Sequence, residues 1–420
     1  TSAGFQSRKP PTDSPDQAYF NLGVLRADDT NAVDWAALKT SMKPATINAE
    51  AWEVIWAGFT NQIGTTWGDY VRMLDDNATY LGRLGQRVVD VGQLLAFEFL
   101  QADGLSPLRT LASAVDAAVE APGLPLVFSR SFSASIFQRF ELGPLGRGWS
   151  HNWEYSLAVA SDGTVTVSGP GGSRRVFQPD SRSTGTTRYF TQPGDHAILS
   201  PLGGGAFTLR EPAGLLHAFR TDGKLDYVQD LNGNRITCAY SGNLLTGLNH
   251  SSGQQLTIAY AAASRVASLT DHLGRQTILS YDGSGEHLLS AQYYDGRTAT
   301  YEYQSLLTSA ATHALISVAN SCCTRRYFTY DAQGRLSGTY RDGNAEAVAF
   351  AYDATGKVTA TDALGSASKF YFDHRGLLVK TQDALGNAVH LAFDDEYNLA
   401  RLTDPAGRSY GYAYDGNGNL

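Results

Sequence analysis

The sequence predicts a mainly β protein, in which an antiparallel β-sheet strip built from short repeats follows a small α-helical module. Among 420 residues there are 43 Gly, 22 Tyr and 18 Phe, while charged residues make up only 18%. Abundant aromatics and glycines with few charges are typical of short strands joined by tight turns. A chain of this length exceeds one ordinary core unless repeats extend that core along an axis.

The strongest signal is a periodic aromatic residue that runs from about residue 222 to the end of the chain. It recurs at Tyr240, Tyr260, Tyr281, Tyr303, Tyr330, Tyr352, Phe372, Phe393 and Tyr414. From Tyr330 onward an aspartate follows directly, giving Asp331, Asp353, Asp373, Asp394 and Asp415. Further aspartates fall half a period away, at Asp342, Asp362, Asp383 and Asp404. Turn markers every 10 or 11 residues predict a regular succession of strand and turn.

Each part of this repeat has a physical role that makes it a candidate structural residue. Period-two alternation places the aromatics on one face, where stacked units would form a ladder of cross-strand pairs. The following aspartate can accept hydrogen bonds from backbone N–H groups of its own turn. Glycine supplies a positive φ at a fixed offset, at Gly334, Gly356, Gly376 and Gly418. Tyr397 replaces glycine in one unit, so that turn must relax or adopt the left-handed conformation.

Three segments carry a family resemblance: 328–336, 383–387 and 414–420 resemble Rhs/YD repeats. This repeat is found in bacterial Rhs proteins, in the C component of insecticidal toxin complexes and in animal teneurins. Residues 125–177 are similar to the strand-rich segment that often precedes it in bacterial Rhs proteins. The resemblance implies a strip that spirals into a hollow shell, which in toxins encloses a C-terminal effector. The 420 residues contain no recognisable self-cleaving segment or effector domain, which puts encapsulation by this piece in doubt.

Changes of composition divide the chain into five parts. We expect a linker at 1–32, an α-helical module at 33–104, a second linker at 105–124, a strand-rich segment at 125–221 and repeats at 222–420. In the helical module Trp52, Ile55, Trp56 and Phe59 share one helical face, and Thr65 or Thr66 caps the next helix. The proline-bearing second linker predicts a separate module, cut there first by proteases.

Several functional classes are disfavoured. The net charge of -8 argues against a nucleic-acid partner, and no apolar run of 18 residues predicts a membrane span. Nine dispersed histidines without a known catalytic motif predict no enzyme activity and no cofactor. Ser150 and His151 are strand neighbours that point to opposite faces. Calcium-like runs at 230–234 and 415–419 lack the later glutamate of an EF-hand, so we predict no metal.

Cys322 and Cys323 are adjacent, and either a vicinal disulfide or two ordinary small residues fits the sequence. The function expected is a non-catalytic scaffold, the shell wall of a secreted or cell-surface protein. Its partner would be its own C-terminal region or an effector beyond residue 420. The alternatives are an adhesin that binds a glycan or protein, and a subunit that self-assembles into an extracellular filament because a strand edge is left unpaired.

Overall fold

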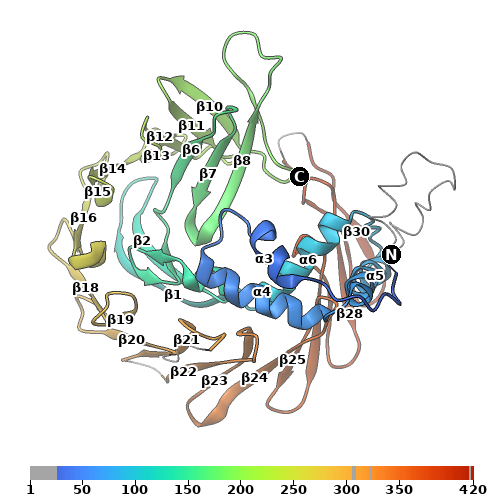
Figure 1. The fold of residues 1–420 in the computed structure, drawn as a ribbon. Helices are drawn as coiled ribbons and strands as arrows, with labels where there is room; N and C mark the ends of the chain where they lie inside the picture. The colour runs from blue at the N-terminus through green and yellow to red at the C-terminus, as the bar shows by residue number, and fades with distance from the viewer. Residues whose placement is uncertain (1–25, 305–308, 322–323, 416–417) are drawn as a thin grey trace.

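The computed structural model describes residues 26–304, 309–321, 324–415 and 418–420, and it confirms the predicted fold class. Strands account for 43% of the chain and helices for 17%. One antiparallel sheet of 21 strands, each paired with the next along the chain, curls into a ring (Figure 1). Its strands are β10 (Ile198–Gly203), β11 (Ala206–Arg210), β12 (Leu216–Phe219), β13 (Leu225–Gln229), β14 (Arg235–Ser241), β15 (Leu244–His250), β16 (Gln255–Tyr260), β17 (Val266–Asp271), β18 (Gln276–Tyr281), β19 (Leu288–Gln292), β20 (Thr298–Tyr303), β21 (Leu315–Asn320), β22 (Arg326–Tyr330), β23 (Leu336–Arg341), β24 (Ala345–Tyr352), β25 (Lys357–Asp362), β26 (Ala367–Phe372), β27 (Leu378–Gln382), β28 (Ala388–Phe393), β29 (Leu399–Thr403) and β30 (Ser409–Gly411).

This repeat sheet begins earlier than the sequence predicted, at Ile198 rather than at about residue 222. Strands β10 to β13 carry no Tyr-Asp pair, so the repeat motif does not reveal the first strands of the sheet. Because consecutive strands are joined by hairpins, the turns alternate between two edges of the strip. The YD rim holds the turns that follow the repeat aromatics, such as 331–335, 353–357, 373–377 and 394–398. The second rim holds the turns halfway between, such as 230–234, 271–275, 362–366 and 383–387.

Two smaller sheets lie inside the ring in Figure 1. One has the order β1 (Thr110–Val119), β2 (Leu126–Ser133), β5 (Trp149–His151), and the other β6 (Ser156–Val159), β7 (Val165–Gly169), β8 (Ser173–Pro179), β9 (Tyr189–Phe190). A short hairpin, β3 (Leu142–Gly143) and β4 (Gly146–Arg147), lies between them. The predicted linker at 105–124 is therefore wrong, because most of it is strand β1. Its prolines flank the strand rather than interrupt it.

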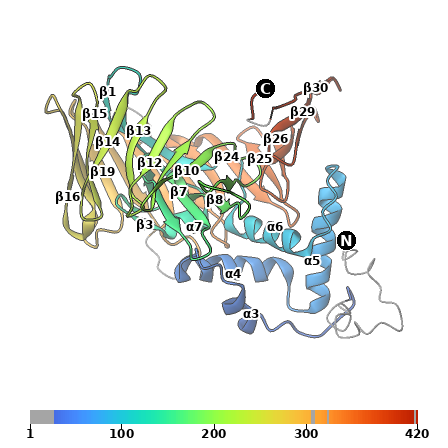
Figure 2. The ribbon, with the colours of Figure 1, turned by 90° about the horizontal axis from the view of Figure 1, so that it is seen from above.

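Five helices lie at one end of the repeat sheet, as the turned view in Figure 2 shows. They are α3 (Trp35–Met42), α4 (Ala49–Ile63), α5 (Trp67–Arg83), α6 (Val91–Asp103) and α7 (Ile136–Phe140). Thr66 caps α5 in a capping box with Asp69, which confirms the predicted helix start. Helix α6 begins at Val91, where Asp90 caps it. The expected linker at 1–32 lies mostly outside the described residues.

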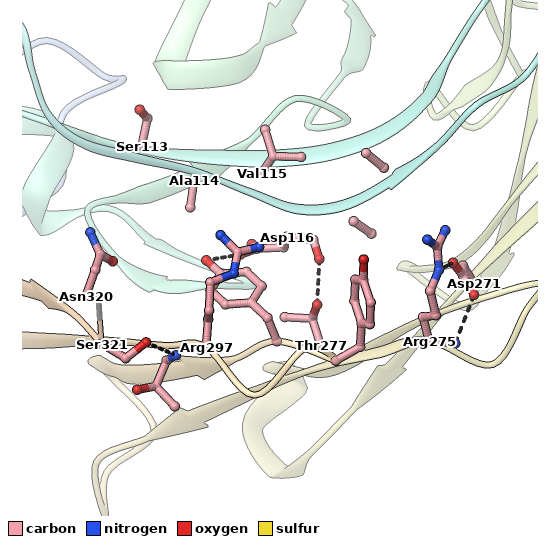
Figure 3. A pocket seen from close by; sticks show the side chains of 15 residues that line it. Ser113, Ala114, Val115, Asp116, Asp271, Arg275, Thr277, Arg297, Asn320 and Ser321 are labelled. Carbon is pink, nitrogen blue, oxygen red and sulfur yellow. Dashed lines mark hydrogen bonds and ion pairs between the residues drawn. The ribbon is translucent and has the colours of Figure 1, made fainter. Parts of the chain in front are cut away.

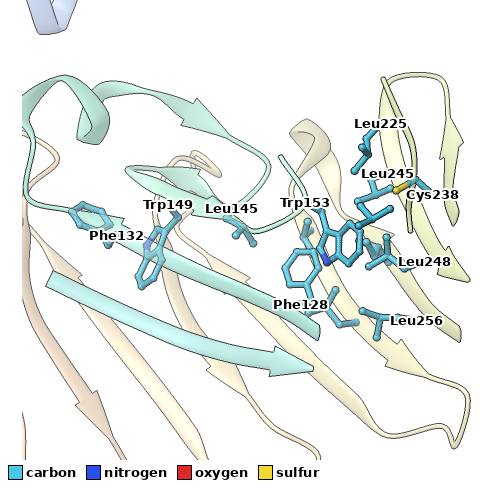
Figure 4. Packing of buried hydrophobic residues seen from close by; sticks show 14 of the residues in the cluster. Phe128, Phe132, Leu145, Trp149, Trp153, Leu225, Cys238, Leu245, Leu248 and Leu256 are labelled. Atoms are coloured by element: carbon cyan, nitrogen blue, oxygen red, sulfur yellow. The ribbon is translucent and has the colours of Figure 1, made fainter. Parts of the chain in front are cut away.

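Buried side chains form two clusters. The larger cluster lies between the inner sheets and the 21-stranded repeat sheet, which we call the wall. There Phe128, Trp149 and Trp153 contact leucines of the repeat strands (Figure 4). The smaller holds the aromatic faces of α4 to α6 and extends to Ile136 and Phe140 of α7. Tyr371 of the repeat sheet packs against this second cluster. The helical module is therefore packed on the sheet, and the prediction of a separate module is wrong.

Candidate functional site

The repeat tyrosines bind their neighbours through the hydroxyl group as well as the ring. In six of the seven repeat tyrosines the hydroxyl donates to a carbonyl oxygen near the start of the preceding strand, at 2.7–3.1 Å. The pairs are Tyr260–Leu245, Tyr281–Val266, Tyr303–Leu288, Tyr330–Leu315, Tyr352–Leu336 and Tyr414–Leu399. Burial raises the pKa of Tyr260 and of Tyr352 to about 12, so both phenols stay protonated donors. The sequence predicted stacked rings but not this ladder of hydroxyl bonds.

The remaining aromatics of the repeat lie on the same rows. Tyr240 is half-buried against the larger cluster, with the Arg220 guanidinium 5.0 Å above its ring. Phe372 is fully buried and Phe393 half-buried, and neither carries a hydroxyl.

The turn aspartates are occupied by the backbone of their own turns. Asp331 Oδ1 accepts from the N–H groups of residues 333 and 335, at 3.0 and 2.8 Å. Asp353, Asp373 and Asp394 accept from the same two positions of their turns, and Asp415 accepts from Asn419. The glycines at the fourth turn position, Gly334, Gly356, Gly376 and Gly418, have φ between 77° and 85°. Tyr397 takes the left-handed conformation in their place, with φ 61°, and rests on Arg375.

The calcium-like run 230–234 forms the same turn. Asp230 Oδ1 accepts from Asn232 and Asn234 N–H groups, and Oδ2 accepts from the Asn234 amide. Among the residues that the structure describes, no group of three or more His, Cys, Asp or Glu side chains is arranged to hold a metal ion.

Three consecutive turns of the YD rim are held by side chains from the N-terminal region. The carbonyl oxygen of Gly334 accepts from Arg139 Nη1 at 2.7 Å, and that of Gly376 accepts from Arg109. Between them, the Tyr80 hydroxyl of α5 lies 3.1 Å from the Gly356 carbonyl oxygen. Each glycine whose φ closes the turn thus presents its carbonyl to a different N-terminal donor.

Tyr80 makes the most extensive of these contacts. Its hydroxyl also lies 2.9 Å from the Phe372 carbonyl oxygen and accepts from the Phe372 N–H at 3.0 Å. Phe372 stands where most repeats have a tyrosine. The Tyr80 hydroxyl therefore contacts a repeat unit that has no tyrosine hydroxyl of its own. Arg139 is 1% exposed, and burial lowers its pKa to about 10, which leaves it cationic at neutral pH.

A buried carboxyl group lies behind this interface. Glu98 of α6 is 1% exposed and accepts from Asn77 at 3.0 Å and from Gln101 at 3.3 Å. With the Gln62 amide oriented so that its nitrogen faces Glu98, that nitrogen donates to Glu98 at 2.9 Å and the amide oxygen accepts from Arg335 of the YD rim at 2.7 Å. Burial raises the pKa of Glu98 to about 7, although Asn77 and Arg335 oppose the shift.

The glycine-rich segment 143–149 fastens two more turns of the YD rim. Arg147 donates its backbone N–H to the Glu286 carbonyl at 2.8 Å and its Nε to the Glu286 carboxylate at 2.8 Å. The Pro144 carbonyl accepts from Val266 at 2.9 Å, and Leu145 is fully buried beside it. This segment therefore holds two YD-rim turns of the repeats that follow it in the chain.

The far end of the strip returns to its beginning. The Gly194 N–H donates to Glu396 at 3.2 Å, and His196 Nε2 lies 3.4 Å from Asn398 Oδ1. Residues 194–196 lead into β10, which starts at the second rim, whereas 394–398 is a turn of the YD rim. After one revolution the YD rim therefore meets the second rim, which is the geometry of a spiral and not of a flat closed ring.

Turns of the second rim carry a row of exposed leucines. Leu364 is 92% exposed and Leu385 is 88% exposed, each directly before the turn glycine. Leu273 occupies the same turn position, and Leu231 lies in the 230–234 turn. An added Cβ would meet nothing within 4 Å at Gly365, in contrast to Gly356, where it would meet the Phe97 ring. These turns face open space.

A buried ion pair within the inner sheet is linked to the wall through Tyr301. Arg130 of β2 and Asp116 of β1 are 2.7 Å apart, and both side chains are fully buried. Arg130 also donates to the Tyr301 hydroxyl at 2.8 Å and lies 4.5 Å from the Trp149 ring centroid. Removing one member of such a pair leaves an uncompensated buried charge, which typically costs about 3–5 kcal/mol.

Two arrangements of histidine bear on the question of catalysis. His151 Nδ1 accepts from the Trp153 N–H, while Ser150 Oγ accepts from Gly171, so the two neighbours have different partners. His287 lies 2.8 Å from Asp282 and 2.9 Å from His313, so the fold brings together histidines that are dispersed in the sequence. Burial lowers the pKa of His313 to about 4, so it is neutral at physiological pH.

Cys322 and Cys323 lie outside the described residues, and Cys238 is a buried thiol. Within the described part of the chain, no helix has the length and apolar character needed to cross a membrane.

A wound antiparallel sheet with an aromatic residue at each repeat, followed by aspartate in the later units, defines the class of a YD-repeat wall, and sequence comparison finds the same repeat. The RHS repeat model matches residues 330–367, and a domain of unknown function, DUF6531, matches residues 109–177. These matches place an Rhs/YD repeat within the chain. No curated protein sequence matches it.

Solved structures of toxin complexes are among its structural neighbours. TcdB2-TccC3 without its hypervariable C-terminal region is 12% identical to this chain. The alignment covers 100% of this chain and 25% of that chain, with a TM-score of 0.34. The Photorhabdus luminescens Tc holotoxin pore is 12% identical, with 92% and 23% coverage and a TM-score of 0.32. TcdB2-TccC3 itself is 10% identical, with 69% and 18% coverage and a TM-score of 0.34. This chain thus spans a quarter or less of those chains.

Proposed function

We propose that the chain is a non-catalytic scaffold that forms the first winding of a β-shell wall, closed at one end by its own N-terminal region. The observation that carries this proposal is the set of three N-terminal donors on Gly334, Gly356 and Gly376. They attach segments from 80 to 139 to the YD rim, and we take that rim as the closed end. The wall then winds away from the closed end, toward the second rim.

The chemistry of the repeat supports a structural role. The turn carboxylates accept backbone N–H groups, and the ladder hydroxyls donate to backbone carbonyls, so both sets of groups stabilise the wall. The family resemblance supports an extracellular or cell-surface location and a cargo held inside the wall, such as a C-terminal effector.

Electron microscopy of the intact protein tests this proposal. We expect a hollow particle with density for the helices across one end only. As a matched pair, Arg139→Ala should loosen the helical end, whereas Arg182→Ala, an exposed arginine bonded within its own turn, should leave it closed. Solid particles, or helices that lie away from the rim, would overturn the proposal.

A second candidate, assembly through the second rim, is favoured by the exposed leucine row. Contiguous exposed apolar surface marks contact sites on soluble proteins. We expect the double variant Leu364→Ser, Leu385→Ser to lower any self-association seen by sedimentation velocity. A protein that stays monomeric at high concentration, with or without these changes, would remove this candidate.

A further inference from the structure

A polar groove of about 510 Å³ lies between strand β1 and the wall, near the second rim (Figure 3). Ser113, Ala114 and Val115 line it from β1, while Arg297, Asn320 and Ser321 line it from the repeat sheet. Its volume lies within the range of about 300–1,000 Å³ typical of ligand sites. The groove is separate from the YD rim and its N-terminal contacts.

The β1 side of the groove is an open strand edge. Strand β1 has one neighbour in its sheet, β2, so among the described residues no strand pairs with its other edge. It is anchored to the wall at Asp116, whose carbonyl accepts from Thr277 Oγ1 at 2.6 Å. A bulge between Val115 and Ala117 turns the Asp116 side chain toward Arg130. The open edge therefore ends at Val115, whose side chain is 55% exposed.

We propose that this groove binds an extended polypeptide segment, which adds to β1 as a fourth strand of the β1-β2-β5 sheet. An unpaired edge offers backbone donors and acceptors that an extended peptide can match. The arginines of the groove each bind an acidic neighbour, Arg275 to Asp271 and Arg297 to Asp295, so the charge along it is balanced. Recognition therefore rests on the peptide backbone and tolerates varied sequences.

This inference rests on the proposed function, because a shell wall would use such a groove to hold an unfolded cargo polypeptide. Sequence tolerance suits a cargo that differs between proteins. The inner sheet holds the groove in place, because the Asp116–Arg130 pair joins β1 to β2 and the Thr277 bond attaches β1 to the wall.

Fluorescence anisotropy with the intact chain tests the proposal. The probe is a fluorescein-labelled octapeptide of alternating threonine and valine, compared with the same peptide N-methylated at alternate residues. We expect N-methylation to weaken binding at least tenfold, because it removes the backbone donors. Val115→Lys should weaken binding by a similar factor. The matched control is Val159→Lys, which changes a valine of similar exposure, 52%, on another edge strand, β6.

Hydrogen exchange on the unmodified chain provides a measurement that does not depend on the variant folding. We expect the peptide to slow amide exchange at residues 112–115. Equal binding of the N-methylated peptide, equal losses in both lysine variants, or no binding at millimolar peptide would each overturn the proposal. A hollow particle without peptide binding would overturn the groove alone, while binding without a hollow particle would leave the groove and refute the shell.

Discussion

The Tyr80 hydroxyl allows the attachment of the helical module to be tested by removing one oxygen atom. Tyr80→Phe keeps the ring, which stacks on Phe97 with centroids 6.1 Å apart. It removes the contacts to the Gly356 and Phe372 carbonyl oxygens and the acceptor for the Phe372 N–H. The change therefore isolates the hydroxyl from the packing of the aromatic ring.

The expected loss follows from the groups left behind. A net hydrogen bond contributes about 0.5–1.5 kcal/mol, and a buried polar group left without a partner costs about 1–3 kcal/mol. The Phe372 N–H keeps only a long contact to the Gly356 carbonyl, at 3.4 Å. We therefore expect Tyr80→Phe to lower the free energy of unfolding by about 2–4 kcal/mol.

Urea unfolding and amide exchange at Phe372 would measure this effect globally and locally. The control is Tyr70→Phe on the same helix, since the Tyr70 hydroxyl has no hydrogen-bond partner within the described residues. We expect the control to change the free energy of unfolding by less than about 0.5 kcal/mol. An unchanged unfolding midpoint and a still-protected Phe372 amide in Tyr80→Phe would refute the proposed attachment.

Three other predictions concern the wall and its interface. Phe372→Ala, at a ring only 1% exposed, should destabilise by about 3–5 kcal/mol, and an unchanged urea midpoint would mean the ring is not part of the core. Glu98→Gln tests pH dependence. Burial raises the Glu98 pKa from 4.5 to about 7, so its stabilising effect is full below pH 4.5 and lost as pH rises through 7. The variant should gain up to about 3 kcal/mol over the unmodified protein between pH 4.5 and 7, whereas parallel pH profiles would contradict the shift. Limited proteolysis should spare 110–119, because that segment is paired in β1, and early cleavage within it, located by mass spectrometry, would contradict the pairing.

The sheet was predictable because its determinants are local. Each turn aspartate binds N–H groups two and four residues ahead, so the interaction lies within one short motif. The alternation that ends in Tyr352 or Phe372 likewise fixes which face of the strand is buried. The left-handed Tyr397 is one of the two outcomes that its place in the repeat allowed.

The interface was not predictable because its partners are far apart in the chain. Tyr80 and Phe372 are separated by 292 residues, and Arg139 and Gly334 by 195. No periodicity links such pairs. Strand β1 was missed for a different reason, since its alanine-rich sequence has weak alternation and neighbouring prolines suggested a linker.

The two rims differ in the residue that stands directly before the turn glycine. Directly before the turn glycine, the YD rim has Gln333, Thr355 and Arg375. Three turns of the second rim have leucine there, Leu273, Leu364 and Leu385, while other turns of that rim have Asn232, Ser252, Asp295 and Ala406. Both sets form the same aspartate-capped turn, so turn chemistry does not require leucine. Burying a leucine side chain is worth about 1.5–3 kcal/mol, which these exposed residues forgo in the isolated winding. The N-terminal helices cover the YD rim, whereas the second-rim turns that carry Leu364 and Leu385 are left open. We infer that the leucines are placed for a contact beyond the present winding.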